Sequence, residues 1–123
     1  MISNESLTNT EKAFIHFFIN NINECNEWRN LIIFQINQAN VCRDVSPYYH
    51  IVRFEYDNTQ IPLIDMSRTQ FPTIQILHND GTAPTVFTLL IRNGLVRMFE
   101  IYNADSSKIN YTSMNDGSVH LGF

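Results

Sequence analysis

The chain has 123 residues, a hydrophobic fraction of 44%, a charged fraction of 16% and a formal net charge of −4. This length suits a single domain spanning residues 1–123, with an ordinary hydrophobic core. The acidic balance disfavours nucleic acid as a direct partner, because phosphate binding calls for clustered Lys and Arg. No apolar stretch approaches the ~20 residues of a membrane span, and the polar start of the chain lacks the pattern of a signal peptide. We therefore expect a cytoplasmic protein that has no membrane partner.

Two helices are predicted in the N-terminal part of the chain. Thr8 and Glu11 have the spacing of a capping box, and apolar residues recur at helical intervals after them until an Asn-rich stretch at 20–23. A second helix is predicted over about residues 26–38, from apolar residues at near-helical spacing. The apolar run at 31–34 leaves a strand as the alternative for part of this segment.

Beyond Pro47 the hydrophobic period changes to two. The segment HIVRFEYD at 50–57 alternates apolar and polar residues, which predicts a strand with one buried and one solvated face. The segment TIQIL at 73–77 repeats the alternation over a shorter length. Two prolines between these strands limit residues 61–65 to an edge strand or a loop.

Asn93-Gly94 lies between the apolar runs 85–92 and 95–103, which is the strongest short-range signal for a β-hairpin. Strict alternation on the second strand would place Glu100 in the core, where an unpaired carboxylate is costly. A β-bulge near Arg97-Met98 would turn Glu100 outward instead, so we predict one there. Together these elements predict an α+β fold, in which N-terminal helices pack on a four- or five-stranded antiparallel sheet with a central β-hairpin.

Patterns for catalysis and metal binding are weak. The histidines are scattered, with no pair at metal-ligand spacing, and the two cysteines match no zinc pattern. There is no Gly-rich phosphate loop and no nucleophile elbow. The sequence therefore predicts no catalytic residue, no metal and no cofactor.

The segment DGTAPTVFTLLIRNGLVRMFEIYNADSSKI resembles a hairpin shared by several bacterial immunity proteins that accompany contact-dependent growth inhibition toxins and other polymorphic toxins. Their pattern is an Asp-Gly turn, an apolar strand, a Gly turn, an acid among apolar or aromatic residues, and a turn containing Asp. This chain supplies these features at Asp80-Gly81, Val86–Ile91, Gly94, Phe99–Tyr102 and Asp105. The segment LTNTEKAFIHFFI resembles the opening helix of the same group.

The resemblance implies an immunity protein that binds and neutralises a cognate toxin C-terminal domain, with no enzymatic activity of its own. Many such toxins are nucleases, whose clefts are basic because they hold phosphates. An acidic binder could occlude the active or substrate-binding site of such a toxin, using acids and aromatic residues on the outside of the sheet and its loops. The candidate toxin-binding residues are Glu55, Asp57, Asp65, Asp80, Glu100, Asp105, Tyr48, Tyr49 and Tyr102.

Two alternatives stay open. A small cone-shaped α+β ligand-binding domain or enzyme fits the length and the order of elements, and would require a deep pocket lined by an Asp and a His. A secretion chaperone would use an exposed apolar sheet face, for which Leu90, Leu95, Met98 and Tyr102 are candidates. The sequence leaves open the oligomeric state and the role of the tail at 110–123.

Overall fold

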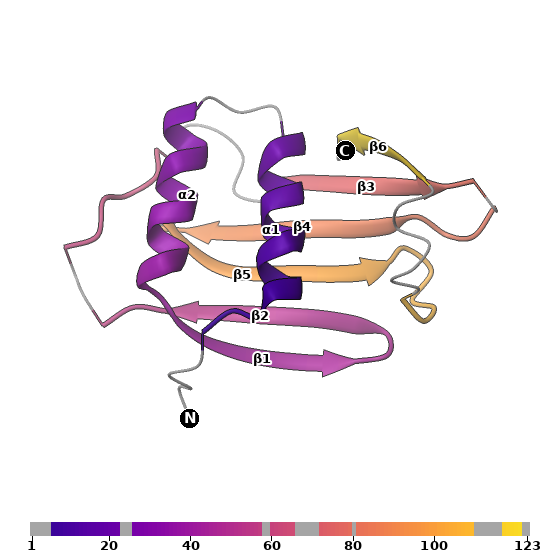
Figure 1. Cartoon of the computed structure of the whole chain (residues 1–123), viewed down its shortest axis with the longest axis horizontal. Coiled ribbons are helices and arrows are strands. Elements are labelled where there is room, and N and C mark those ends of the chain that lie inside the picture. The colour runs from indigo at the N-terminus through magenta and orange to yellow at the C-terminus, as the bar shows by residue number, and fades with distance from the viewer. Residues whose placement is uncertain are drawn as a thin grey trace.

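A computed structural model describes residues 6–22, 26–57, 60–65, 72–79 and 81–109, and the backbone of 117–121. These residues form an α+β fold in which two helices lie on one face of an antiparallel sheet (Figure 1), so the predicted fold class is confirmed. In chain order, the elements are α1 (Asn9–Asn21), α2 (Asn26–Gln38), β1 (Asn40–Ser46), β2 (Tyr49–Glu55), β3 (Thr73–His78), β4 (Thr85–Arg92), β5 (Leu95–Asn103) and β6 (Gly117–Leu121).

Both helices follow the sequence prediction. At the start of α1, the Thr8 side chain accepts a hydrogen bond from the Glu11 N–H at 3.1 Å, and the Glu11 carboxylate accepts one from the Thr8 N–H at 2.9 Å. The predicted capping box is therefore formed. The run at 31–34 is helical, because it lies inside α2. Of the helices that the structure describes, neither is long and apolar enough to cross a membrane.

The sheet has the strand order β1-β2-β5-β4-β3-β6, and all its neighbouring strands run antiparallel. It has one strand more than the four or five expected. Neither edge strand, β1 or β6, follows from the alternation in the sequence. In β1 only Val41 is buried, so the strand lacks the alternating apolar residues that reveal β2. The segment 61–65, predicted as an edge strand or a loop, forms no strand.

Phenylalanine side chains join α1 to the sheet. The ring of Phe18 on α1 lies edge-to-face with Phe99 on β5, with centroids 5.6 Å apart. Phe99 in turn meets Phe87 on β4 at 6.1 Å, and Phe87 meets Phe14 on α1 at 5.9 Å. Such pairs contribute about 0.5–1.5 kcal/mol beyond the area they bury. The chain of rings therefore fixes where α1 sits over the centre of the sheet.

The β4–β5 hairpin has the predicted bounds. Asn93 and Gly94 have φ angles of 53° and 79°, the left-handed backbone that a type I′ turn requires. A side chain at Gly94 would also meet Leu63, since a Cβ atom there would lie 2.8 Å from the Leu63 Cβ. The Ile64 N–H donates to the Gly94 carbonyl at 2.9 Å. The turn is thus held closely against the segment 60–65.

The predicted bulge is confirmed in the same hairpin. Ile91 pairs with Val96, but the next residue, Leu90, pairs with Met98. Arg97 is therefore the extra residue on β5. Its insertion shifts the register of the strand, so the residues after it change sides relative to strict alternation.

Gln35 of α2 is fully buried, and its amide group binds the backbone beside the hairpin turn. Its Nε2 donates to the carbonyls of Gly94 and Pro62, both at 2.8 Å. Its Oε1 accepts from the Val96 N–H at 2.9 Å. One side chain thus connects α2, the segment 60–65 and the start of β5, with both ends of its amide satisfied.

We expect the Gln35→Met substitution to destabilise the protein by about 2–4 kcal/mol, because it removes two buried hydrogen bonds, with the Gly94 carbonyl and the Val96 N–H, and a partly buried one with the Pro62 carbonyl. Urea unfolding followed by circular dichroism measures the loss. The matched control is Gln38→Met, on the exposed face at the end of the same helix, which should change stability by less than about 0.5 kcal/mol. Equal midpoints for the two variants would contradict this role for Gln35.

Candidate functional site

The two faces of the sheet carry different side chains. Both helices lie on one side, and neither covers the other side (Figure 1), which we call the open face. Alternate residues of the three central strands β2, β5 and β4 project from the open face, and those between them enter the core. The residues on this side of the three strands are Tyr49, Ile51, Arg53, Met98, Glu100, Tyr102, Val86, Thr88 and Leu90. Val86 is buried at 2% exposure, and the others are half-buried or exposed.

The bulge determines which residues of β5 belong to the open face. Val96 is fully buried before the bulge, and Phe99 and Ile101 are 1% exposed after it. Glu100 and Tyr102 lie between these core residues and are half-buried on the other side. The prediction that both would face outward is confirmed, and Glu100 lies opposite Thr88 on β4.

Cross-strand pairing arranges the open face in three rows. The first row pairs Tyr49 with Tyr102 and Tyr102 with Val86. In the third row, Arg53 pairs with Met98 and Met98 pairs with Leu90. The middle row, which runs between them, consists of Ile51, Glu100 and Thr88. Glu100 is therefore the centre of a patch of mostly aromatic and aliphatic side chains.

The Glu100 carboxylate has an unusual environment for a surface acid. Burial raises its pKa above the ordinary 4.5, and the charge of Arg53 opposes that rise. Within the described part of the chain, no hydrogen bond or ion pair reaches the carboxylate. The hydroxyl of the facing Thr88 lies 3.2 Å from the Thr73 hydroxyl instead. Glu100 thus carries a partly desolvated carboxylate that has no partner among the described residues.

The structure brings three of the candidate toxin-binding residues together. Tyr49 and Tyr102 are cross-strand partners. Glu100 precedes Tyr102 by two positions on β5 and lies on the same face of the sheet. All three are half-buried, which suits residues that contact a partner while remaining packed against their neighbours. The pairing of β2 with β5 is what joins them, since Tyr49 is far from the other two in sequence.

The remaining candidates lie apart from this group. Glu55 ends β2 and forms an ion pair with Arg97 at 3.6 Å, and the Asp57 carboxylate accepts from the Asn40 side chain at 2.8 Å. Asp65 is exposed in the segment 60–65. Tyr48 is 48% exposed in the β1–β2 turn, at the opposite end of β2 from Glu55, and Asp105 is exposed in the turn after β5. Asp80 lies outside the described residues.

A buried cluster that the sequence does not predict forms around Glu11, whose side chain is 2% exposed. Arg43 of β1 donates to both carboxylate oxygens, at 2.8 and 2.9 Å, and His50 Nε2 of β2 lies 2.8 Å from Oε2. With the Thr8 N–H, four contacts saturate the carboxylate. The capping-box spacing is the one local signal for Glu11, and it reveals the Thr8 contact alone.

These contacts determine the charge state of Glu11. Burial by itself would raise the pKa of the carboxyl group. The hydrogen bonds from Arg43, from the Thr8 backbone and from His50 outweigh burial, and they lower the pKa from 4.5 to about 2. The cluster therefore holds α1 to the first two strands through a buried charge. No lone pair is left for a substrate, so we assign this cluster a structural role.

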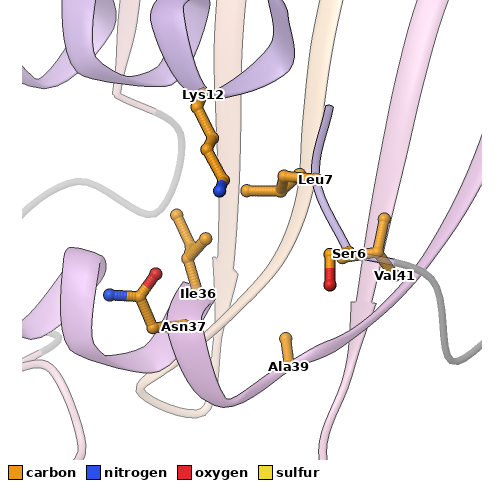
Figure 2. Close-up of a pocket in the computed structure, with 7 residues that line it drawn as sticks. All are labelled: Ser6, Leu7, Lys12, Ile36, Asn37, Ala39 and Val41. Carbon is orange, nitrogen blue, oxygen red and sulfur yellow. The ribbon is translucent and has the colours of Figure 1, made fainter. Parts of the chain in front are cut away.

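A groove runs between α1 and α2. Two adjoining cavities of about 330 and 310 Å³ share Leu7, Lys12, Ile36 and Asn37 in their walls. Figure 2 shows the Lys12 side chain extending from α1 toward Ile36 and Leu7. The second cavity adds His16 and further isoleucines. The groove is thus aliphatic with a cationic edge, and no Asp lines either cavity.

Among the described residues, no group of three or more His, Cys, Asp and Glu side chains is placed to hold a metal ion. His78 belongs to a polar network in which its Nε2 lies 2.7 Å from the Thr85 hydroxyl, and that hydroxyl donates to the Asn103 side chain at 2.7 Å. Of all these features, the open face is the one that gathers predicted binding residues, so we take it as the candidate functional site.

We expect the stability of the wild-type protein to depend on pH through Glu11. Because the folded-state pKa is about 2, below the ordinary 4.5, the carboxylate stabilises the fold above pH 4.5. This contribution, about 3 kcal/mol for such a shift, is lost as the pH falls from about 4.5 toward 2. Urea unfolding at several pH values tests it. Glu11→Gln should be less stable at pH 7 and less sensitive to acid, whereas the exposed Glu27→Gln control should behave as wild type.

We also expect the pKa of Glu100 to lie above 4.5 in the folded protein, because burial disfavours the charged form. Its ionisation then lowers stability as the pH rises through that pKa. NMR titration of the side-chain carboxyl groups measures the value, and Arg53→Gln should raise it further. Asp105 is an internal control, since hydrogen bonds from Ser107 lower its pKa below 3.8. A Glu100 pKa at or below 4.5 would contradict the partly desolvated environment.

Comparison with known proteins identifies no relative of this chain. No protein-family model matches the sequence. No curated protein and no solved structure matches it either. Function must therefore be inferred from the open face and from the hairpin pattern quoted above.

Proposed function

We propose that this protein is a cytoplasmic immunity protein that binds and neutralises a cognate bacterial toxin domain, a nuclease, by occluding its active or substrate-binding site. The protein contributes no chemistry of its own. The resemblance of the β4–β5 hairpin to immunity proteins supports the class of function. The observation that carries the mode of action is the meeting of Tyr49, Glu100 and Tyr102 on the open face.

The composition of the open face favours protein binding. Interfaces are enriched in aromatic residues and Met at their centres, and a few such anchors supply most of the binding energy. Tyr49, Tyr102 and Met98 are half-buried, so they are already held in place and lose little freedom on binding. The face is also built on strands that each pair with a neighbour on both sides, which suits a surface that must fit one partner.

An immunity protein must hold its toxin inhibited at low cellular concentration. That requires a Kd near nanomolar or below, or about −12 kcal/mol or better. An interface of roughly 1,600 Å² reaches this value when its anchors are well buried. The net charge of −4 adds attraction toward a basic nuclease cleft, and opposite charge speeds association at low salt.

Two other functions have some support. The groove between α1 and α2 favours a ligand-binding protein, in which Lys12 would neutralise a carboxylate on an aliphatic ligand. The enzyme alternative requires an Asp and a His in one pocket, and these cavities carry His16 without an Asp. A secretion chaperone would use the same open face, with half-buried Leu90 and Met98 receiving an apolar segment.

The test is to mix the purified protein with the toxin domain encoded upstream of its gene. We expect a complex with a Kd near nanomolar, loss of toxin activity in the complex, and faster association at low salt. Tyr102→Ala should weaken binding at least about tenfold, as expected for an anchor residue. Isothermal titration calorimetry and stopped-flow fluorescence measure these quantities.

Lys12→Ala is the matched control on the helical side of the molecule, and it should leave toxin binding unchanged. Loss of binding on Lys12→Ala but not on Tyr102→Ala would move the binding site to the groove. Absence of a complex at low salt would reject the immunity function. A complex with a secretion effector in place of a toxin would favour the chaperone.

A further inference from the structure

We propose that the Glu100 carboxylate binds an arginine side chain of the partner. The aromatic and aliphatic rows of the open face enclose this contact. This inference rests on the proposed function and adds the chemistry of the partner at the centre of the interface. The partner then presents an arginine within an apolar surface, so that the guanidinium meets the carboxylate while its surroundings exclude water.

The surroundings of Glu100 define the space for such a group. Met98 and Tyr102 lie two residues away along β5, on the same face. Ile51 and Thr88 lie directly opposite on the neighbouring strands. Residues in directly opposite positions of a sheet have Cβ atoms about 5 Å apart, and diagonal neighbours about 7–8 Å. Both distances are within reach of long side chains. The carboxylate is thus ringed on all four sides.

The diagonal neighbours complete this ring. They are Tyr49, Arg53, Val86 and Leu90. Arg53 is the one charged residue among them, and it is exposed to solvent. It acts on Glu100 through charge, without a hydrogen bond or ion pair among the described residues. The hydrogen-bonding positions of the carboxylate are therefore open to a group that approaches from outside.

An arginine fits this site better than other side chains. Its planar guanidinium can donate two parallel hydrogen bonds to one carboxylate. It also stacks on aromatic rings, which Tyr102 and Tyr49 supply on one side of Glu100. Its aliphatic stem can lie along Met98 and Leu90 on the other side. Binding replaces the water that a partly buried carboxylate holds poorly, which is consistent with the raised pKa of Glu100.

The free protein should gain stability when this charge is removed. A carboxylate that is partly desolvated and without a partner destabilises the fold in which it sits. Glu100→Gln keeps the size of the side chain and should therefore unfold at the same or a higher urea concentration than wild type. A loss of binding in that variant cannot then be attributed to misfolding.

The experiment measures binding of the upstream-encoded toxin domain to Glu100→Gln, with Glu27→Gln as the control. Both substitutions remove one negative charge, but Glu27 is exposed on α2 and lies outside the open face. We expect Glu100→Gln to weaken binding at least about 30-fold, because the partner's arginine is left buried without its counter-charge. Glu27→Gln should stay within about threefold of wild type, and Arg53→Gln should bind equally well or more tightly, since it removes a competing cation.

Arginine-to-alanine substitutions in the toxin domain then locate the partner group. One of them should weaken binding to the wild-type protein but have little further effect on Glu100→Gln, which is the signature of a direct pair. If Glu100→Gln binds as wild type while Tyr102→Ala does not, the open face is the interface but this proposal is overturned. If wild-type protein forms no complex, the proposed function and this inference both fall.

Discussion

The layout of this protein depends on one inserted residue, Arg97, and on the side chain that fixes the backbone beside it. Gln35 holds Gly94 and Val96 through buried hydrogen bonds, so the chain enters the bulge in a defined position. Without the insertion, alternation would turn Glu100 into the core, where its charge would have no counterpart. With it, the core receives apolar residues and the carboxylate reaches the opposite face. The helical layer and the candidate binding surface are therefore linked at this point.

Local signals in the sequence reveal the hairpin but not the strands and residues that it contacts. Asn93-Gly94 and the costs of a buried acid are enough to predict the bounds of β4 and β5, the bulge and the outward side of Glu100. The contact of Tyr49 with Tyr102 depends on β2 pairing with β5, two strands that are not consecutive in the chain. The contacts of Glu11 with Arg43 and His50 span 32 and 39 residues of the sequence, and no local pattern predicts them. Sequence reasoning therefore named single candidate residues and could not predict which of them lie together.

Two glutamates show how environment assigns a role to the same side chain. Glu11 is almost fully enclosed, yet four contacts keep it charged and bind α1 to the sheet. Glu100 is only half-buried, but it has no such contacts among the described residues, and its pKa moves in the opposite direction. A buried carboxylate with all its hydrogen bonds made stabilises the fold. A partly buried carboxylate without such bonds lowers stability, and the fold alone gives no reason for its presence. This contrast is the physical reason for the proposal that Glu100 meets a charged group of a partner.

The strict in-and-out order of the central strands also separates two kinds of sequence change. On β2, Val52 and Phe54 are fully buried, whereas Ile51 and Arg53 between them belong to the open face. Replacing an outward residue leaves the packing of its inward neighbours intact, and such surface changes usually alter stability by no more than about 0.5 kcal/mol. Substitutions at the outward positions of these three strands can therefore change what the open face contacts without changing the core. Deletion of a single codon at the bulge, by contrast, would turn the outward residues of β5 beyond it toward the core and its core residues outward.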